Sequence, residues 1–280
     1  MLRGDHAVTA ATVAEYYNQA TELISADLGG SLHFGYWHGL PENSSMQDAS
    51  RQMTELMISK LSVGPGQRVL DVGCGAGRPA ADLSRATGAS VVGVDISPRQ
   101  IELATGLART EGMEDKLSFQ LADVMSLPFE ADTLDAAWLF ESMFHMPDQS
   151  RVLEEIARVL RPGGRVAIAN LVQRVPLTEE QNAALEEYWK VGNVAALLPL
   201  EDYPKLLSDS GLVLTELADI SEDTTGPTFE AIGRTHAARA VGHTESLAPG
   251  ELASQMGAGM DQFIATPEIG FAIIVASKPG

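Results

Sequence analysis

The sequence has little cysteine and no long apolar run. Cys74 is the only cysteine among 280 residues, so no disulfide forms within the chain, as is typical of proteins from a reducing compartment. No stretch approaches the roughly twenty apolar residues of a membrane span. The opening Met-Leu-Arg-Gly-Asp-His has no apolar core of the kind found in signal peptides. We therefore expect a cytoplasmic globular protein.

Positive charge is also scarce. Nineteen Lys and Arg face 38 Asp and Glu, which gives a formal net charge of −19, and no basic cluster interrupts the acidity. Proteins that bind nucleic acids or anionic membranes need Lys and Arg to neutralise phosphates. The composition therefore predicts neither partner and favours a small molecule. It leaves open whether the chain forms a homo-oligomer.

The histidines are scattered. They stand at positions 6, 33, 38, 145, 236 and 243, with no pair at i,i+4 and no cysteine beside them. Transition-metal sites place such ligands at characteristic short spacings, so we expect no site of that kind. A loosely held magnesium ion needs only oxygen ligands, and the sequence does not decide that point.

The most informative segment is residues 69–77, which read Val-Leu-Asp-Val-Gly-Cys-Gly-Ala-Gly. An apolar, β-branched approach to Asp71 is typical of a buried parallel strand. Glycines then turn the chain and allow its backbone to approach a ligand. The dinucleotide fingerprint needs a glycine at position 78, which is Arg, and no Gly-Lys-Ser/Thr of a P-loop follows. The pattern that remains is D-x-G-x-G-x-G.

Further segments follow at regular distances. Residues 90–95 read as a second buried strand that ends in Asp95. An acid about 20 residues beyond such a loop commonly holds the hydroxyls of a ribose. Residues 119–124, Leu134–Phe140 and Leu160–Ala169 read as three more strands, the last opened by Leu-Arg-Pro-Gly-Gly. The acids at strand ends also have a plainer interpretation as caps of turns or helices.

These five ordered segments resemble the class I S-adenosylmethionine (SAM)-dependent methyltransferases. The resemblance implies an α/β Rossmann-like fold with a seven-stranded, mostly parallel sheet, an antiparallel last strand and helical lid and cap insertions. It implies SAM as cofactor, with Asp123 and the Val124 N–H at the adenine. The residues it places at SAM are Tyr36, Asp71, Gly73, Gly75, Gly77, Asp95, Ile96, Gln100, Ala122, Asp123, Val124, Phe140 and Glu141.

The resemblance also predicts how the chain is divided. A helix is expected over residues 51–61, where apolar side chains recur at helical spacing. The predicted parts are an N-terminal helical lid segment (1–50), the SAM-binding core (51–171), a cap insertion (172–205), a core strand region (206–220), a second cap insertion (221–262) and the final core strand (263–280).

Substrate selection is expected from the parts that are extra to the core fold. Their apolar members could line a cavity for a bulky, mostly apolar molecule; the alternative is that they only cover the sheet. Two further candidates, Phe144 and Asn170, follow the fourth and fifth predicted strands. The candidate acceptor-binding residues are therefore Phe34, Trp37, Phe144, Asn170, Trp189, Leu197 and Met260.

Two segments narrow the resemblance. His33-Phe-Gly-Tyr-Trp37, together with Glu141-Ser-Met-Phe-His-Met-Pro-Asp148, is similar to bacterial natural-product methyltransferases of the rebeccamycin sugar O-methyltransferase type. In that family the aromatic segment closes over SAM, and the second segment faces the acceptor. Several relatives have His at the place of Phe144 and Asp at the place of Asn170, the residues credited with deprotonating a sugar hydroxyl. The acceptor is therefore left open.

An alcohol acceptor loses its proton during methyl transfer and benefits from a base. His145 is the main candidate and His33 the second, although either could be a structural histidine. We expect a SAM-dependent methyltransferase that acts on a hydroxyl, or an amine, of a small and largely apolar secondary metabolite. The alternatives are a SAM-fold cyclase without net methyl transfer and a non-catalytic SAM-binding protein.

Overall fold

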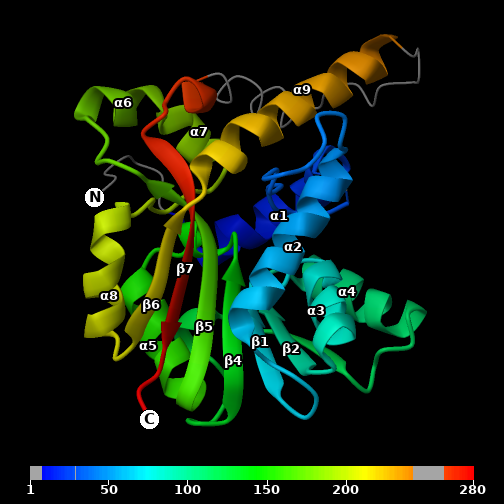
Figure 1. Ribbon diagram of the computed structural model, residues 1–280, viewed down its shortest axis with the longest axis vertical. Coiled ribbons are helices and arrows are strands. Elements are labelled where there is room, and N and C mark those ends of the chain that lie inside the picture. Colours follow the sequence, from blue (N-terminus) through cyan, green and yellow to red (C-terminus); the bar gives the residue numbers. More distant parts are fainter. Residues whose placement is uncertain (1–7, 29, 242–261) are drawn as a thin grey trace.

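Short apolar runs, rich in β-branched residues and separated by glycine, form the central strands. The computed structural model describes residues 8–28, 30–241 and 262–280, and Figure 1 shows one twisted sheet with helices on both sides. The strand order is β3-β2-β1-β4-β5-β7-β6. The strands are β1 (Arg68–Val72), β2 (Ser90–Asp95), β3 (Leu117–Leu121), β4 (Leu134–Phe140), β5 (Leu160–Gln173), β6 (Val213–Asp219) and β7 (Ile269–Ser277).

Strand direction confirms the predicted fold class. β1 pairs in parallel with β2 and β4, and the parallel ladder continues from β2 to β3 and from β4 to β5. β7 lies between β5 and β6 and is antiparallel to both. Six strands therefore run in one direction and the last runs against them, as the resemblance to class I methyltransferases implies. The carboxyl ends of β1, β2 and β4 meet at one edge of the sheet.

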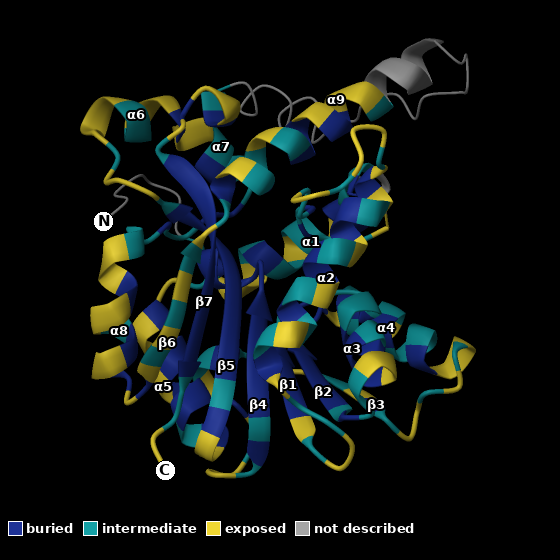
Figure 2. Cartoon of the chain, viewed as in Figure 1, coloured by how far each residue is buried: buried dark blue, intermediate teal, exposed yellow. Residues whose placement is uncertain are grey.

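Side-chain alternation along β5 divides the core into two halves. Ala167, Ala169 and Leu171 face one buried cluster, which also contains apolar residues of α2 (Met46–Leu61) and α3 (Arg78–Thr87). Val166 and Ile168 face the other, with residues of α5 (Gln149–Val159) and α8 (Tyr203–Asp209). Both faces of the sheet are thus covered, as parallel sheets require, and Figure 2 shows the central strands almost wholly buried.

The helices that cover the sheet include several that the sequence predicted. Pro98 opens α4 with Ser97 as its N-cap, and Pro79 lies in the first turn of α3, both as expected. The helices are α1 (Ala10–Asp27), α2 (Met46–Leu61), α3 (Arg78–Thr87), α4 (Pro98–Thr110), α5 (Gln149–Val159), α6 (Glu179–Ala184), α7 (Glu186–Val191), α8 (Tyr203–Asp209) and α9 (Thr225–Val241).

Two predicted boundaries were wrong for local reasons. The helix expected from residue 51 begins at Met46, because Ser45 and Asp48 form a capping box that starts it earlier. It therefore crosses the predicted border between lid and core. The strand expected over 119–124 ends at Leu121, because the Asp123 carboxylate accepts the Met125 N–H at 2.9 Å and turns the chain into a 3₁₀ helix.

The predicted insertions contain the expected helices. Residues 172–205 hold α6 and α7, although β5 extends to Gln173 and takes the first two positions. The insertion at 221–262 holds α9, and its part from residue 242 lies outside the described residues. Within the described ranges, no helix is long and apolar enough to cross a membrane.

Candidate active site

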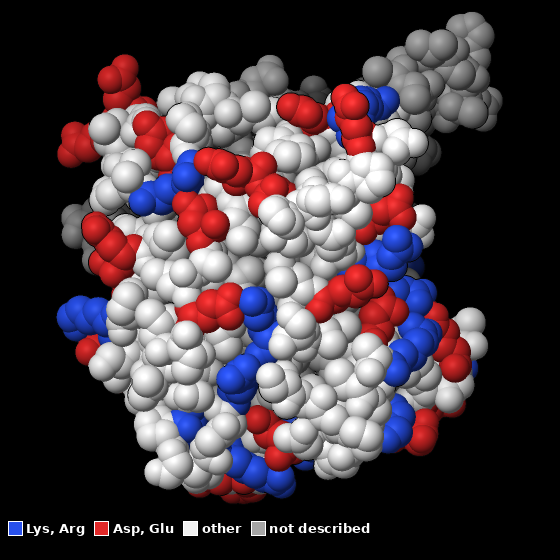
Figure 3. Space-filling model, in the orientation of Figure 1, with Lys and Arg blue, Asp and Glu red and all other residues white. Residues whose placement is uncertain are grey.

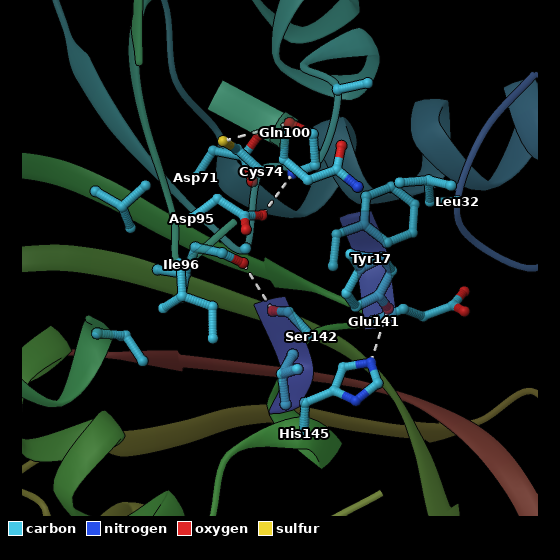
Figure 4. Close-up of a pocket in the computed structure, with 18 of the residues that line it drawn as sticks. Tyr17, Leu32, Asp71, Cys74, Asp95, Ile96, Gln100, Glu141, Ser142 and His145 are labelled. Atoms are coloured by element: carbon cyan, nitrogen blue, oxygen red, sulfur yellow. Dashed lines mark hydrogen bonds between the residues drawn. The ribbon is translucent and has the colours of Figure 1, made fainter. Parts of the chain in front are cut away.

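A cavity lies at the carboxyl ends of β1, β2 and β4, under α1. With its mouth it contains about 1210 Å³ of empty space. Figure 4 shows side chains from the loop after β1, from the ends of β2 and β4, and from α1 gathered around it. The predicted residues that line it are His33, Asp71, Gly73, Gly75, Asp95, Ile96, Gln100, Ala122, Asp123, Val124, Phe140, Glu141 and His145.

The three loop glycines have different structural roles. Their φ angles are +71°, +51° and +83° at Gly73, Gly75 and Gly77, values that L side chains rarely adopt. A Cβ on Gly73 would lie 2.5 Å from the Cβ of Ser142, and one on Gly77 would lie 2.9 Å from Ala104 and Phe119. Protein packing therefore requires those two. Gly77 does not line the cavity, whereas Gly75 does, and a Cβ there would lie 3.1 Å from the Leu32 Cδ1.

Asp95 anchors the loop as well as facing the cavity. Its Oδ2 accepts the Gly75 N–H at 3.1 Å, and its Oδ1 accepts the Ser97 N–H at 2.8 Å. Burial raises the pKa of Asp95, and the bonds from Ser97 and Gly75 oppose that shift. Each carboxylate oxygen has a further lone pair, so both remain able to accept a hydroxyl of a ribose.

We expect Asp95→Ala to weaken SAM binding by about 30- to 150-fold, because hydrogen bonds to a charged group are worth about 2–3 kcal/mol together. Titration calorimetry measures the loss, and a thermal melt checks that the fold is retained. Asp95→Asn is the matched control, since its amide oxygen can still accept one N–H. A loss below about threefold in the alanine variant would show that the ribose is held elsewhere.

Helix α1 is fixed over the cavity by three polar contacts. The Tyr17 hydroxyl lies 2.7 Å from His145 Nε2, the Ser97 hydroxyl donates to Asn18 at 2.7 Å, and the Gln100 amide donates to Thr21 at 2.7 Å. Sequence analysis expected a lid in residues 1–50 but missed Tyr17. The one available signal was Tyr16-Tyr17 within a helical segment, and nothing in the sequence connects it to His145.

His145 lies in a 3₁₀ turn after β4, with both ring nitrogens bonded. Nδ1 is 2.9 Å from the carbonyl oxygen of Asn193. A carbonyl only accepts, so Nδ1 carries the proton, and Nε2 accepts the O–H of Tyr17. Burial lowers the pKa of His145 to about 4, although the hydrogen bond to the Asn193 carbonyl acts to raise it. The ring is therefore neutral at physiological pH, with its lone pair directed at a cavity hydroxyl.

His33 also lines the cavity but has neither nitrogen free. Nδ1 lies 3.0 Å from the Phe34 carbonyl, and Nε2 lies 3.2 Å from the Thr54 hydroxyl. The ring stacks on Phe140 with centroids 4.1 Å apart, and burial lowers its pKa to about 4. This arrangement gives His33 a packing role and no route to a substrate proton.

The cavity is acidic and lacks free cations. Glu141 is buried, its Oε1 accepts the Phe34 N–H at 2.7 Å, and burial raises its pKa well above the usual range. Burial also raises the pKa of Asp71 to about 7. Among the described residues that line the cavity, Arg78 is the one Lys or Arg, and it pairs with Glu111 at 2.7 Å. Buried acids without counter-charges suit a cationic ligand such as a sulfonium.

Those predicted acceptor residues that the structure describes do not line this cavity. Four of them pack together in the apolar cluster on one sheet face: Phe34, Phe144, Trp189 and Leu197. Phe144 does not line the cavity itself but packs against His145, which does. The centroids of the two rings are 4.2 Å apart. The other members of this cluster include Phe229, Phe263 and Phe271.

Other predicted residues lie elsewhere. The Trp37 indole donates to the Thr228 hydroxyl at 3.1 Å, and Tyr36 stacks on His38 rather than facing the expected cofactor. The prediction for Asn170 places it at the acceptor, but its amide donates to the hydroxyl of Tyr203 at 3.3 Å on the opposite face of the sheet, where β5 alternation directs it. Met260 lies outside the described residues.

The amino-acid sequence matches known proteins over nearly its full length. The model of the family described as "Methyltransferase domain" matches residues 70–168. The chain is 40% identical to methyltransferase GfsG of Streptomyces halstedii, over 95% of this chain and 94% of that protein. It is 32% identical to 27-O-demethylrifamycin SV methyltransferase of Amycolatopsis mediterranei, over 95% and 97% of the two chains.

Comparison with solved structures shows the same overall fold. The [4+2]-cyclase SpnF superposes with a TM-score of 0.81 at 29% sequence identity, covering 98% of this chain and 97% of that one. The glycine loop, the acid at the end of β2 and the uncompensated acids fit a SAM-binding cavity. The chain therefore belongs to the class I SAM-dependent methyltransferases, and SAM is its cofactor.

Proposed function

We propose that this enzyme methylates a hydroxyl group of a small, largely apolar secondary metabolite. The observation that carries the proposal is the Tyr17–His145 pair, a neutral imidazole whose Nε2 accepts an O–H in the SAM cavity. A hydroxyl acceptor must lose its proton, and this pair offers a place for it. The similarity to a rifamycin O-methyltransferase supports oxygen as the acceptor atom.

The chain's own residues supply positioning and a path for the proton. When bound, SAM supplies a methyl group on a positively charged sulfur. Burial raises the pKa of Tyr17, so its hydroxyl keeps a proton while the cavity is at rest. In the reaction, Tyr17 takes the proton of the acceptor as it passes its own to His145 Nε2. The Asn193 carbonyl, bonded to Nδ1–H, stabilises the imidazolium that forms.

The surroundings favour an apolar and neutral acceptor. The aromatic cluster of Phe34, Phe229, Phe263 and Phe271 lies next to the cavity wall formed by Phe140 and Glu141. On the face drawn in Figure 3, basic side chains lie beside acidic ones, and no separate basic patch is visible. A charged phosphate acceptor would find no free cation among the described cavity residues.

We further propose that the enzyme acts in the cytoplasm.

A cyclase is the second candidate, because SpnF shares 29% identity over nearly the whole chain. The two functions differ in mass balance. Incubation of the purified enzyme with SAM and apolar hydroxylated metabolites should give S-adenosylhomocysteine (SAH) and a methylated product in equal amounts, measured by mass spectrometry. A product of unchanged mass, formed without SAH, would overturn the methyltransferase proposal in favour of cyclisation.

A further inference from the structure

We propose that Glu141 selects SAM over SAH by giving up its proton when the positively charged methyl donor binds and taking one back after transfer. The two cofactor forms differ by one methyl group and by the positive charge on sulfur. The inference depends on the assignment of the cavity to SAM and not on the acceptor proposed above.

The backbone holds Glu141 in an unusual position. Its φ is +52°, in the left-handed region that residues other than glycine rarely adopt. Its N–H donates to the Ala169 carbonyl at 2.8 Å, which fixes the turn at the end of β4. The carboxyl group is thereby directed to the cavity wall under the Leu32 segment (Figure 4), where Oε1 accepts the Phe34 N–H.

No positive charge compensates this acid among the described residues of the cavity. The two histidines that line the same cavity, His33 and His145, have pKa values lowered to about 4 by burial and are neutral. Arg78, the one Lys or Arg among the lining residues that the structure describes, is paired with Glu111. The other described titratable groups around the cavity and around Glu141 carry negative charge or none: Asp71 from β1, Cys74 after β1, Asp95 from β2, Asp123 after β3, Tyr17 from α1 and Tyr188 from α7.

These surroundings determine the protonation state of Glu141. Burial raises the pKa of Glu141 well above that of a free carboxyl, so it is protonated when no cation is near. A positive charge in the same cavity favours the ionised form. Binding of SAM then releases a proton, and the affinity for SAM rises with pH until the pKa of the free enzyme is passed, by at most about tenfold per pH unit.

Loss of the methyl group shifts Glu141 back from the ionised form to the protonated form. Methyl transfer removes the charge from sulfur, and an ionised Glu141 is left in a cavity of low polarity without a partner. It regains a proton from solvent, while the acceptor's own proton leaves through Tyr17 and His145. Because SAM and SAH share the same ammonium and carboxylate groups, a comparison of the two isolates the effect of the sulfonium. Product release is favoured by the same change in charge.

Titration calorimetry tests this without turnover. SAM, SAH and sinefungin, which has an amine near the place of the sulfonium, are titrated between about pH 6 and 9 in two buffers of different ionisation enthalpy. For the wild type we expect SAM and sinefungin to bind more tightly as pH rises and to release more protons than SAH does. Glu141→Gln keeps an oxygen for the Phe34 N–H. We expect it to bring the SAM/SAH affinity ratio near one and to abolish the extra proton.

Asp123→Asn is the matched control, because Asp123 lines the same cavity and its expected contact is with the adenine that SAM and SAH share. Asp71→Asn tests the rival assignment, because burial also raises the pKa of Asp71, to about 7. We expect both variants to retain the pH dependence of the SAM/SAH ratio. The proposal is overturned if Glu141→Gln keeps the wild-type ratio and proton release, or if Asp71→Asn abolishes them. Should Glu141→Gln fail to fold, the wild type alone decides: equal proton release with SAM and SAH excludes the mechanism. Failure here leaves the hydroxyl-methylation proposal intact.

Discussion

Replacing His145 by alanine is expected to lower kcat by about 10²- to 10⁴-fold while SAM affinity stays close to that of the wild type. The imidazole receives the acceptor's proton through Tyr17, whose hydroxyl lies 2.7 Å from His145 Nε2. Single-turnover kinetics measure the chemical step, and calorimetry with SAM checks the cofactor site. A loss below about tenfold would remove His145 from the mechanism.

The pH profile gives a second measure of the same group. An unperturbed imidazole is half neutral near pH 6.5. Burial instead lowers the pKa of His145 to about 4. The base is active when neutral, so the wild-type kcat at saturating SAM should be level from about pH 8 down to 5.5 and fall only toward pH 4. An amine acceptor would give an acid limb at its own pKa, and that limb would persist in His145→Ala.

Tyr17→Phe is the control for the proton path, because it keeps the ring over the cavity and removes only the hydroxyl. We expect a kcat loss in the same direction, since the acceptor's proton then has no bridge to Nε2. If the Tyr17→Phe enzyme retained the wild-type rate, the acceptor would have to reach His145 directly, and the relay through Tyr17 would be wrong.

Gly75→Val should abolish measurable SAM binding, a loss of more than about 100-fold, in a protein that still folds. The φ of +51° disfavours a β-branched residue, and a Cβ there would lie 3.1 Å from the Leu32 Cδ1, with the valine methyls in the space the cofactor needs. Calorimetry with SAM and a thermal melt separate the loss of binding from the loss of stability.

Gly73→Ala is the contrasting variant. Its Cβ would lie 2.5 Å from the Cβ of Ser142, so the expected result is a lower melting temperature rather than a selective loss of SAM. Unchanged SAM affinity in Gly75→Val would contradict the assignment of the loop. A stable Gly73→Ala protein would contradict the packing role given to that glycine.

The sequence was sufficient for the fold because its signals are local. The glycine loop, the acids that end β1 and β2, and the Pro-Gly-Gly turn of β5 each carry their own backbone requirement. The site was only partly predictable, because Tyr17 and His145 lie 128 residues apart and meet only when α1 packs over the sheet. Asn170 was misplaced for a related reason, since one residue of strand register decides which face it occupies.

The position of β7 has a consequence for how the protein is made. β7 (Ile269–Ser277) is the last strand of the sheet in the sequence, yet it pairs with both β5 and β6. On the ribosome, β1 to β5 can assemble as soon as they emerge, whereas β6 has no neighbour until β7 has been synthesised. Until then the hydrogen-bonding edges of β5 and β6 are both exposed, which makes nascent chains in this interval the most prone to aggregate.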